Sequence, residues 1–85
     1  MVEFSYVIKD ELGIHARPAG LLAKTAAGFK SNISLSVGGE TVDAKRLISI
    51  MKLGAQHGQT AAFTIEGEDE AAAAQALQSF MNENL

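Results

Sequence analysis

Cysteine and tryptophan are absent from this 85-residue sequence, and proline occurs only once. Without cysteine the chain can form no disulfide bond, carries no thiol nucleophile and offers no thiolate to a metal ion. Two histidines remain as nitrogen ligands, His15 and His57, and neither has a carboxylate cluster at ligand spacing beside it. Because a metal site needs several such ligands together, we expect neither a bound metal nor a cofactor.

A surplus of basic residues is also missing, since seven Lys and Arg residues stand against ten Asp and Glu residues, for a formal net charge of −3. The basic residues are scattered, and the only aromatic residues are one tyrosine and four phenylalanines. Nucleic-acid binding needs a concentrated positive surface, so we expect no nucleic-acid partner. The chain also lacks a glycine-rich nucleotide loop and the nucleophile elbow that accompanies many Ser/His/Asp triads.

No long apolar run occurs, although 47% of the residues are hydrophobic. This composition is typical of a small folded protein with one core, and it argues against a membrane-inserted segment. The length fits a single domain over residues 1–85. Residues 1–5 lack the basic stretch and apolar block of a secretory signal, so we expect a cytoplasmic protein.

Alternation of apolar with polar side chains predicts strands in three segments, residues 2–9, 33–37 and 61–66. A fourth strand is predicted through Thr41 and Val42. The Gly38-Gly39 pair before it can adopt positive φ at both turn positions, which favours a tight hairpin.

Helical spacing of apolar residues predicts three helices between and after these strands. The first runs from Ala16 to about Phe29, with Leu21 on a face expected to be buried and Gly28 near its end. The third opens at residues 68–70, where Asp69 is a suitable N-cap. Its expected buried stripe consists of Ala73, Ala74, Leu77, Phe80 and Met81. The resulting order predicts an α+β two-layer sandwich, with three helices on one face of a four-stranded sheet.

The second predicted helix, residues 45–53, is too short to bury all of its apolar side chains. Leu47, Ile50 and Met51 share one face by helical spacing, and Ile48 lies off that face. We therefore expect some of these side chains to be exposed. Exposed apolar clusters often mark surfaces for partner proteins, although the same residues could merely cover an edge of the sheet.

The stretch from Gly13 to Gly20 joins the first strand to the first helix and places His15 at or beside the helix N-cap. The first N–H groups of a helix lack intrahelical partners and carry the positive end of the helix dipole, which favours anions such as phosphate. His15 supplies a nucleophilic ring nitrogen, and Arg17 supplies a fixed positive fork. This arrangement indicates a covalent phosphate site on His15.

Other roles stay open from the residues alone. His15 could be a bare N-cap, although Ser, Thr, Asp or Asn would serve better, or a metal ligand that lacks companions. Arg17 could be an ordinary exposed arginine. His57, in Gln56-His57-Gly58, is expected in a solvated turn without a functional role.

Gly13-Ile14-His15-Ala16-Arg17-Pro18-Ala19 resembles the active-site signature of the HPr family, the histidine-containing phosphocarriers of the bacterial sugar phosphotransferase system. The resemblance covers the whole chain, including residues 45–54, which resemble the family's regulatory and docking helix. It implies an open-faced sandwich of four antiparallel strands and three helices, and a phosphocarrier instead of an enzyme.

The resemblance also implies roles for individual residues. His15 would accept a phosphoryl group on Nδ1 from phosphorylated enzyme I and pass it to sugar-specific IIA domains. Arg17 and the backbone N–H of Ala16 would stabilise that group. Enzyme I and the IIA domains are thus the implied partners of an expected monomer. The implied docking residues are Leu47, Ile48 and Met51, with Ile50 and Leu53 in the core.

Arg46 departs from the family pattern, in which many members carry a serine at this position that a dedicated kinase phosphorylates. We therefore expect that this chain is not a substrate of that kinase, and Ser49 is a substitute only by proximity. Arg46 also adds positive charge beside the implied docking residues, which favours acidic partner surfaces. Two related functions stay open, a nitrogen-branch phosphocarrier and a regulatory HPr-like protein that acts by binding partner proteins.

Overall fold

Four strands form one antiparallel sheet in the computed structural model, which describes residues 1–85. Their bounds are Val2–Val7 for β1, Asn32–Val37 for β2, Glu40–Asp43 for β3 and Thr60–Glu66 for β4. The spatial order is β1-β4-β2-β3, so the last strand of the sequence pairs with both β1 and β2. Gly38 and Gly39 have φ angles of 60° and 88°, which confirms the predicted hairpin between β2 and β3.

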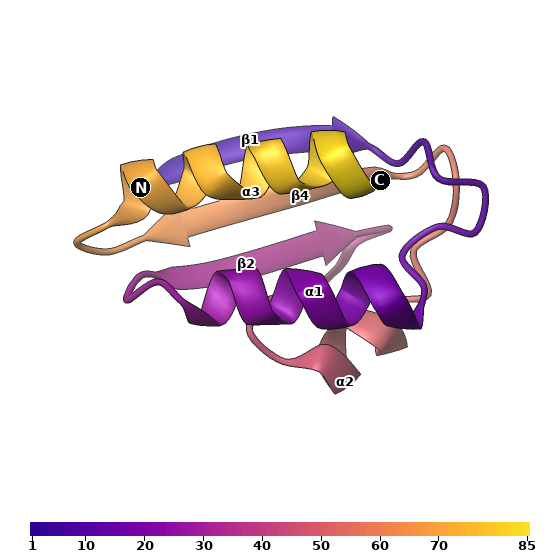
Figure 1. The fold of residues 1–85 in the computed structure, drawn as a ribbon, viewed down its shortest axis with the longest axis horizontal. Helices are drawn as coiled ribbons and strands as arrows, with labels where there is room; N and C mark the ends of the chain where they lie inside the picture. Colours follow the sequence, from indigo (N-terminus) through magenta and orange to yellow (C-terminus); the bar gives the residue numbers. More distant parts are fainter.

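Three helices cover one face of this sheet: α1 spans Ala16–Ala27, α2 spans Leu47–Lys52 and α3 spans Glu70–Asn84. Figure 1 shows α1 and α3 lying side by side and running along the strands, with α2 beside the N-terminal half of α1. The predicted α+β two-layer sandwich is therefore confirmed. None of the helices combines the length and the hydrophobicity that a bilayer-spanning helix requires.

The core lies between the helices and the apolar face of the sheet, as the period-two patterns require. β2 and β4 supply its centre, and β1 extends it with half-buried side chains, of which Phe4 stacks on Phe63 with ring centroids 4.8 Å apart. The buried strand residues are Ile33, Leu35, Val37, Ala61, Phe63 and Ile65. The helices contribute Ala19, Leu22, Ala23, Ala26, Ile50, Ala73, Ala74, Leu77 and Met81.

Several details of the helices differ from the expectation. α1 ends at Ala27, and Gly28 keeps a right-handed φ of −73°, so its freedom to adopt positive φ is not what ends the helix. Leu21 was expected in the core but is 43% exposed, because it lies on the side of α1 that faces away from the sheet. Phe80 is only half-buried at the edge of the core. α2 has six residues instead of nine, since Lys45 lies in the preceding turn, Arg46 is the N-cap and Leu53 is the C-cap.

Asp69 occupies the N-cap position of α3, but its carboxylate forms no hydrogen bond to that helix. It accepts instead from the Ser31 hydroxyl and from the backbone N–H groups of Ser31 and Lys30, at 2.9 Å each for the two N–H groups. These bonds, led by the Ser31 hydroxyl, lower the pKa of Asp69. Asp69 therefore ties the start of α3 to the turn before β2, at the end of the sheet opposite to His15.

Candidate functional site

The loop between β1 and α1 is pressed against the loop that precedes β4. Gly13 has a φ of 68°, and a Cβ atom at this position would overlap the carbonyl oxygen of Ala55. The N–H of Ile14 donates to that same carbonyl at 3.0 Å, and the Ile14 side chain is buried. Glycine is therefore required at residue 13 both by its backbone angle and by the close approach of a second chain segment. This packing fixes the backbone just before His15.

His15 is the N-cap residue of α1, with extended backbone angles of φ −90° and ψ −174°. Its carbonyl accepts the N–H of Ala19 at 2.9 Å, yet its ring forms no capping hydrogen bond to the helix. The N–H groups of Ala16 and Arg17 have no acceptor within the chain, because the first residues of a helix lack intrahelical partners. Pro18, the third residue of the helix, has no N–H, so these two groups are the free donors at this helix end. The helix start thus presents an imidazole that does not cap the helix, beside two free backbone donors.

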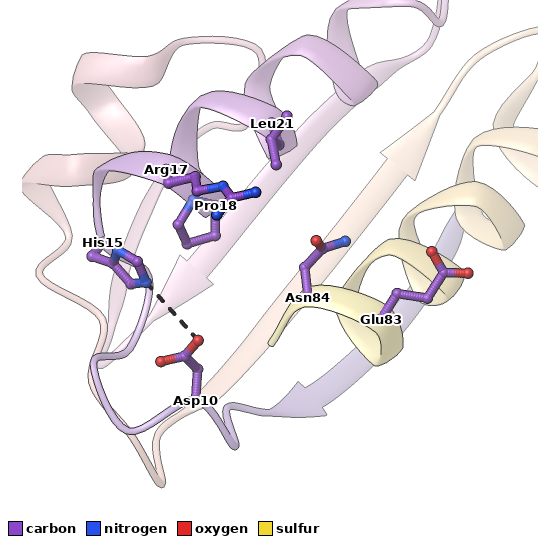
Figure 2. A pocket seen from close by; sticks show the side chains of 7 residues that line it. All are labelled: Asp10, His15, Arg17, Pro18, Leu21, Glu83 and Asn84. Atoms are coloured by element: carbon purple, nitrogen blue, oxygen red, sulfur yellow. Dashed lines mark ion pairs between the residues drawn. The ribbon is translucent and has the colours of Figure 1, made fainter.

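A shallow hollow opens beside this ring between the first turn of α1 and the last turn of α3 (Figure 2). The end of α3 is held at this point because its C-cap residue, Leu85, is tied to the loop that follows β1: the carbonyl of Leu85 accepts the N–H of Lys9 at 2.7 Å and of Asp10 at 2.9 Å. Arg17 lies on the α1 side and is exposed, and it forms no ion pair within the chain. The lining consists of Asp10, His15, Arg17, Pro18, Leu21, Glu83 and Asn84.

Asp10 faces the histidine across the hollow. One of its carboxylate oxygens accepts the N–H of Leu12 at 2.8 Å, and the other lies 3.9 Å from Nε2 of His15 (Figure 2). The two side chains are 29% and 39% exposed, so the pair is partly shielded from solvent. No group of three or more His, Cys, Asp or Glu side chains comes together as a metal site would require.

Comparisons with known proteins agree with this arrangement. Residues 2–83 match the family model described as the PTS HPr component phosphorylation site. Phosphocarrier protein HPr of Xylella fastidiosa is 40% identical over 77 residues, which make up 91% of this chain and 86% of that relative. The chain belongs to the HPr family. It is therefore a phosphocarrier of the phosphotransferase system, a protein that carries a phosphoryl group and is not a catalytic enzyme.

Solved HPr structures share the fold over nearly the whole chain. The histidine-containing phosphocarrier protein of a Mycoplasma superposes with a TM-score of 0.94 at 33% identity, and the match covers 96% of this chain and 93% of that one. A crystal structure of an HPr dimer from Thermoanaerobacter tengcongensis matches with a TM-score of 0.77 at 37% identity, covering 98% and 95% of the two chains. The antiparallel open sandwich that the resemblance implied is thus confirmed for this chain.

The three implied docking residues of this chain lie together on the exposed side of α2. Leu47, Ile48 and Met51 are 39%, 64% and 44% exposed, whereas Ile50 is fully buried beneath them. We call Leu47, Ile48 and Met51 the α2 patch. It does not line the hollow, but α2 packs directly against α1, whose first turn carries Arg17. The expectation that part of this helix is exposed is confirmed.

Arg46 is exposed at the N-cap of α2 and approaches Asp43, with 3.8 Å between its Nε and a carboxylate oxygen. Ser49 is half-buried, and His57 is exposed in a turn, as expected. The structure therefore places Arg46 at the border of the α2 patch and brings only His15 and Arg17 of the expected site residues into the hollow, with the N–H of Ala16 at the same helix end.

Four residues of the hollow were missed by the sequence reasoning: Asp10, Leu21, Glu83 and Asn84. Leu21 follows the apolar pattern of α1 and gave no sign of exposure. Glu83 and Asn84 come from the other end of the chain, and only the strand order and the length of α3 bring them here. Asp10 had one usable signal, a carboxylate that precedes a glycine turn next to a histidine.

Proposed function

We propose that Nδ1 of His15 accepts a phosphoryl group from phosphorylated enzyme I and passes it to sugar-specific IIA domains. The observation that carries this proposal is the His15 ring at the start of α1, which makes no capping hydrogen bond to the helix and lies in one hollow with the Arg17 guanidinium. As the phosphorus–Nδ1 bond forms, the phosphorus–nitrogen bond of the donor histidine breaks on the opposite side of the phosphorus. No group is lost or gained besides the phosphoryl group.

The residues around His15 supply positive potential to the transferred group. The N–H groups of Ala16 and Arg17 have no partner in the chain, so they are free to donate to phosphoryl oxygens. The Arg17 guanidinium adds a fork of charged donors, and the aligned peptide dipoles of α1 add to the potential. These donors are in place before the phosphoryl group arrives, which is how electrostatic stabilisation acts without reorganisation.

The α2 patch is the proposed contact surface for enzyme I and the IIA domains, with Arg46 at its border favouring acidic partners. A hollow as open as this one suits transfer between proteins, since the reacting histidine of a partner must reach His15. In this proposal residues 1–85 act as one domain, as a monomer in the cytoplasm where both partners take up and release the phosphoryl group.

The test is incubation with phosphoenolpyruvate and enzyme I, followed by measurement of acid-labile, alkali-stable phosphate. We expect one phosphoryl group per chain in the wild type and none in His15→Ala. His57→Ala is the matched control, because it removes the other histidine from an exposed turn, and it should be phosphorylated as fully as the wild type. Absence of incorporation under conditions that charge a known HPr would contradict the carrier function and favour a regulatory binding role.

A further inference from the structure

The geometry points to Asp10 as a positioning residue for His15, which keeps a proton on Nε2 and so leaves the lone pair of Nδ1 free for phosphorus. This inference rests on the proposed phosphorylation of Nδ1. Asp10 provides the only carboxylate that approaches the ring within 4.0 Å, and it does so at Nε2, with 3.9 Å between the two atoms. Glu83 is the other carboxylate that lines the hollow, but it forms no ion pair with the ring, and Arg17, also in the lining, is itself a cation.

Asp10 is itself held in place by three hydrogen bonds to backbone groups, two through its own backbone and one through its side chain. Its N–H donates to the carbonyl of Leu85 at 2.9 Å, and its carbonyl accepts the N–H of Gly13 at 2.9 Å. Its Oδ1 accepts the N–H of Leu12 at 2.8 Å, which sets the side-chain torsion and leaves Oδ2 to face the ring. A carboxylate anchored in this way keeps its position relative to His15 because the same loop fixes both residues.

A fixed carboxylate beside one ring nitrogen decides which nitrogen carries the proton. Neutral imidazole has one N–H, and the anion favours the form in which that N–H points at it. The proton then sits on Nε2, and the Nδ1 lone pair is available at the other side of the ring. A catalytic histidine held by an aspartate in serine proteases follows the same logic. For this chain, the result is that the ring is prepared to react at Nδ1 before a donor binds.

The same carboxylate also serves the transfer step. When Nδ1 bonds to phosphorus while Nε2 keeps its proton, the ring takes on positive charge, and the donor ring leaves as a neutral imidazole with its own N–H. No proton has to move in either protein. Asp10 lies next to the nitrogen that shares this new charge, and therefore stabilises the phosphorylated ring. In the reverse direction His15 leaves as the neutral Nε2–H form, which is the form that Asp10 selects.

The first test reads the proton position directly, on the unphosphorylated protein. Ring ¹⁵N chemical shifts of His15, recorded above about pH 8, where histidine rings are neutral, distinguish the two forms. We expect the Nε2–H form to predominate in the wild type, and the Nδ1–H form to increase in Asp10→Asn. Asparagine keeps an oxygen that accepts the N–H of Leu12, so this variant removes the charge and retains the turn. Glu11→Gln, which removes a carboxylate from the adjacent exposed residue, is the matched control and should give the wild-type spectrum.

The second test measures the rate of phosphoryl transfer to His15 from phosphorylated enzyme I. We expect Asp10→Asn and Asp10→Ala to be slower than the wild type by roughly threefold to tenfold, the size expected for a partly exposed charge pair, with Glu11→Gln unchanged. If Asp10→Asn matches the wild type in spectrum and rate while Asp10→Ala is slow, Asp10 serves only the turn and the inference is overturned.

The two tests separate this inference from the function on which it rests. If the wild type takes up no phosphoryl group at all, the proposed function fails, while the ring spectra still report whether Asp10 selects the Nε2–H form. If the wild type is phosphorylated and the spectra of wild type and Asp10→Asn coincide, the function stands and the positioning role is wrong.

Discussion

Arg17 lines the hollow beside His15, is exposed and forms no ion pair, so its guanidinium is free to meet a phosphoryl group. Charge-assisted hydrogen bonds from such a fork are among the stronger ones in proteins. We expect Arg17→Ala to slow phosphoryl transfer to His15 by roughly 10- to 100-fold while the fold stays intact. Rapid-quench measurement of transfer from phosphorylated enzyme I gives the rate, and circular dichroism checks the fold.

Two further variants show whether the effect belongs to the site. Arg17→Lys keeps the charge but loses the planar fork, and its rate should fall between those of wild type and Arg17→Ala. Lys30→Ala removes an exposed positive charge at the opposite end of the sheet and should leave transfer unchanged. Equal rates for wild type and Arg17→Ala would remove Arg17 from the site.

Asp69 couples the stability of the fold to pH. Its pKa is lowered in the folded state, chiefly by the Ser31 hydroxyl and then by the N–H of Lys30. As the pH falls below about 4, the unfolded chain takes up a proton at this residue before the folded chain does, so the free energy of unfolding decreases. The loss is complete once the pH has passed below the folded pKa. We expect Asp69→Asn to be less stable at neutral pH and to lose less stability on acidification.

Urea denaturation from pH 7 to about pH 2 measures this dependence. Glu68→Gln is the control, since it removes the same charge from a neighbouring carboxylate. Glu68 is 83% exposed, and its one ion pair, with Lys30, is long at 4.0 Å and therefore weak. If wild type and Asp69→Asn show the same pH dependence, the Ser31 contact does not hold the carboxylate in its charged form.

At the residue scale, the sequence predicts what the signature stretch contains but not what faces it. His15 and Arg17 could be named because a helix start, a histidine and an arginine share one short segment. Asp69 could be placed at the start of α3, but its true partner, Ser31, lies 38 residues away and is brought there by the pairing of β2 with β4. Contacts between segments that are distant in the sequence cannot be predicted from any local pattern of residues.

At the element scale, α2 is the part of the fold whose apolar surface exceeds what it can bury. Ile48 is the most exposed residue of the α2 patch, at 64%, so a charge there costs the fold little. We expect Ile48→Glu to raise the apparent KM for this chain in phosphorylation by enzyme I by about tenfold, with little change in kcat, because docking is weakened and the reacting atoms are unchanged.

Val7→Glu is the matched control for the α2 patch. Val7 is another large apolar residue, 52% exposed, but it lies on the open face of the sheet, away from the helices. Its substitution should leave the KM unchanged. If both variants raise the KM alike, the effect is one of charge and not of the α2 patch, and the docking proposal for this helix is wrong.

The type and order of the elements could be predicted because each periodic pattern is long enough to identify a strand or a helix. Boundaries were less accurate where tertiary contacts decide them. α2 begins only at Leu47, since Asp43 accepts the N–H of Lys45 and the Lys45 ammonium donates to the carbonyl of Phe29, and both bonds hold the preceding turn out of the helix. The order of the strands in the sheet could not be predicted either, because the alternation of apolar and polar residues identifies a strand but not its neighbours.

At the scale of the whole molecule, that strand order builds the hollow. Because β4 lies between β1 and β2, α3 runs back along β1 and ends beside the loop that carries Asp10. The hollow beside His15 is thus lined by residues from the loop between β1 and α1, the first turns of α1 and the end of α3. The signature stretch from Gly13 to Ala19 therefore supplies only part of the residues that line the site.

The proposed carrier function also constrains the assembly of the molecule. A dimer interface of standard size buries about 800 Å² on each partner, and a homodimer formed through the exposed apolar surface would cover the α2 patch, which is the proposed contact surface for enzyme I and IIA domains. We therefore expect a monomer of 9.0 kDa in sedimentation equilibrium over a wide range of concentrations, even though a related HPr has been crystallised as a dimer. A mass of twice that value would contradict the monomer. In that case Ile48→Glu locates the interface. A dimer that dissociates in this variant uses the α2 patch, whereas a dimer that persists leaves the α2 patch free for partners.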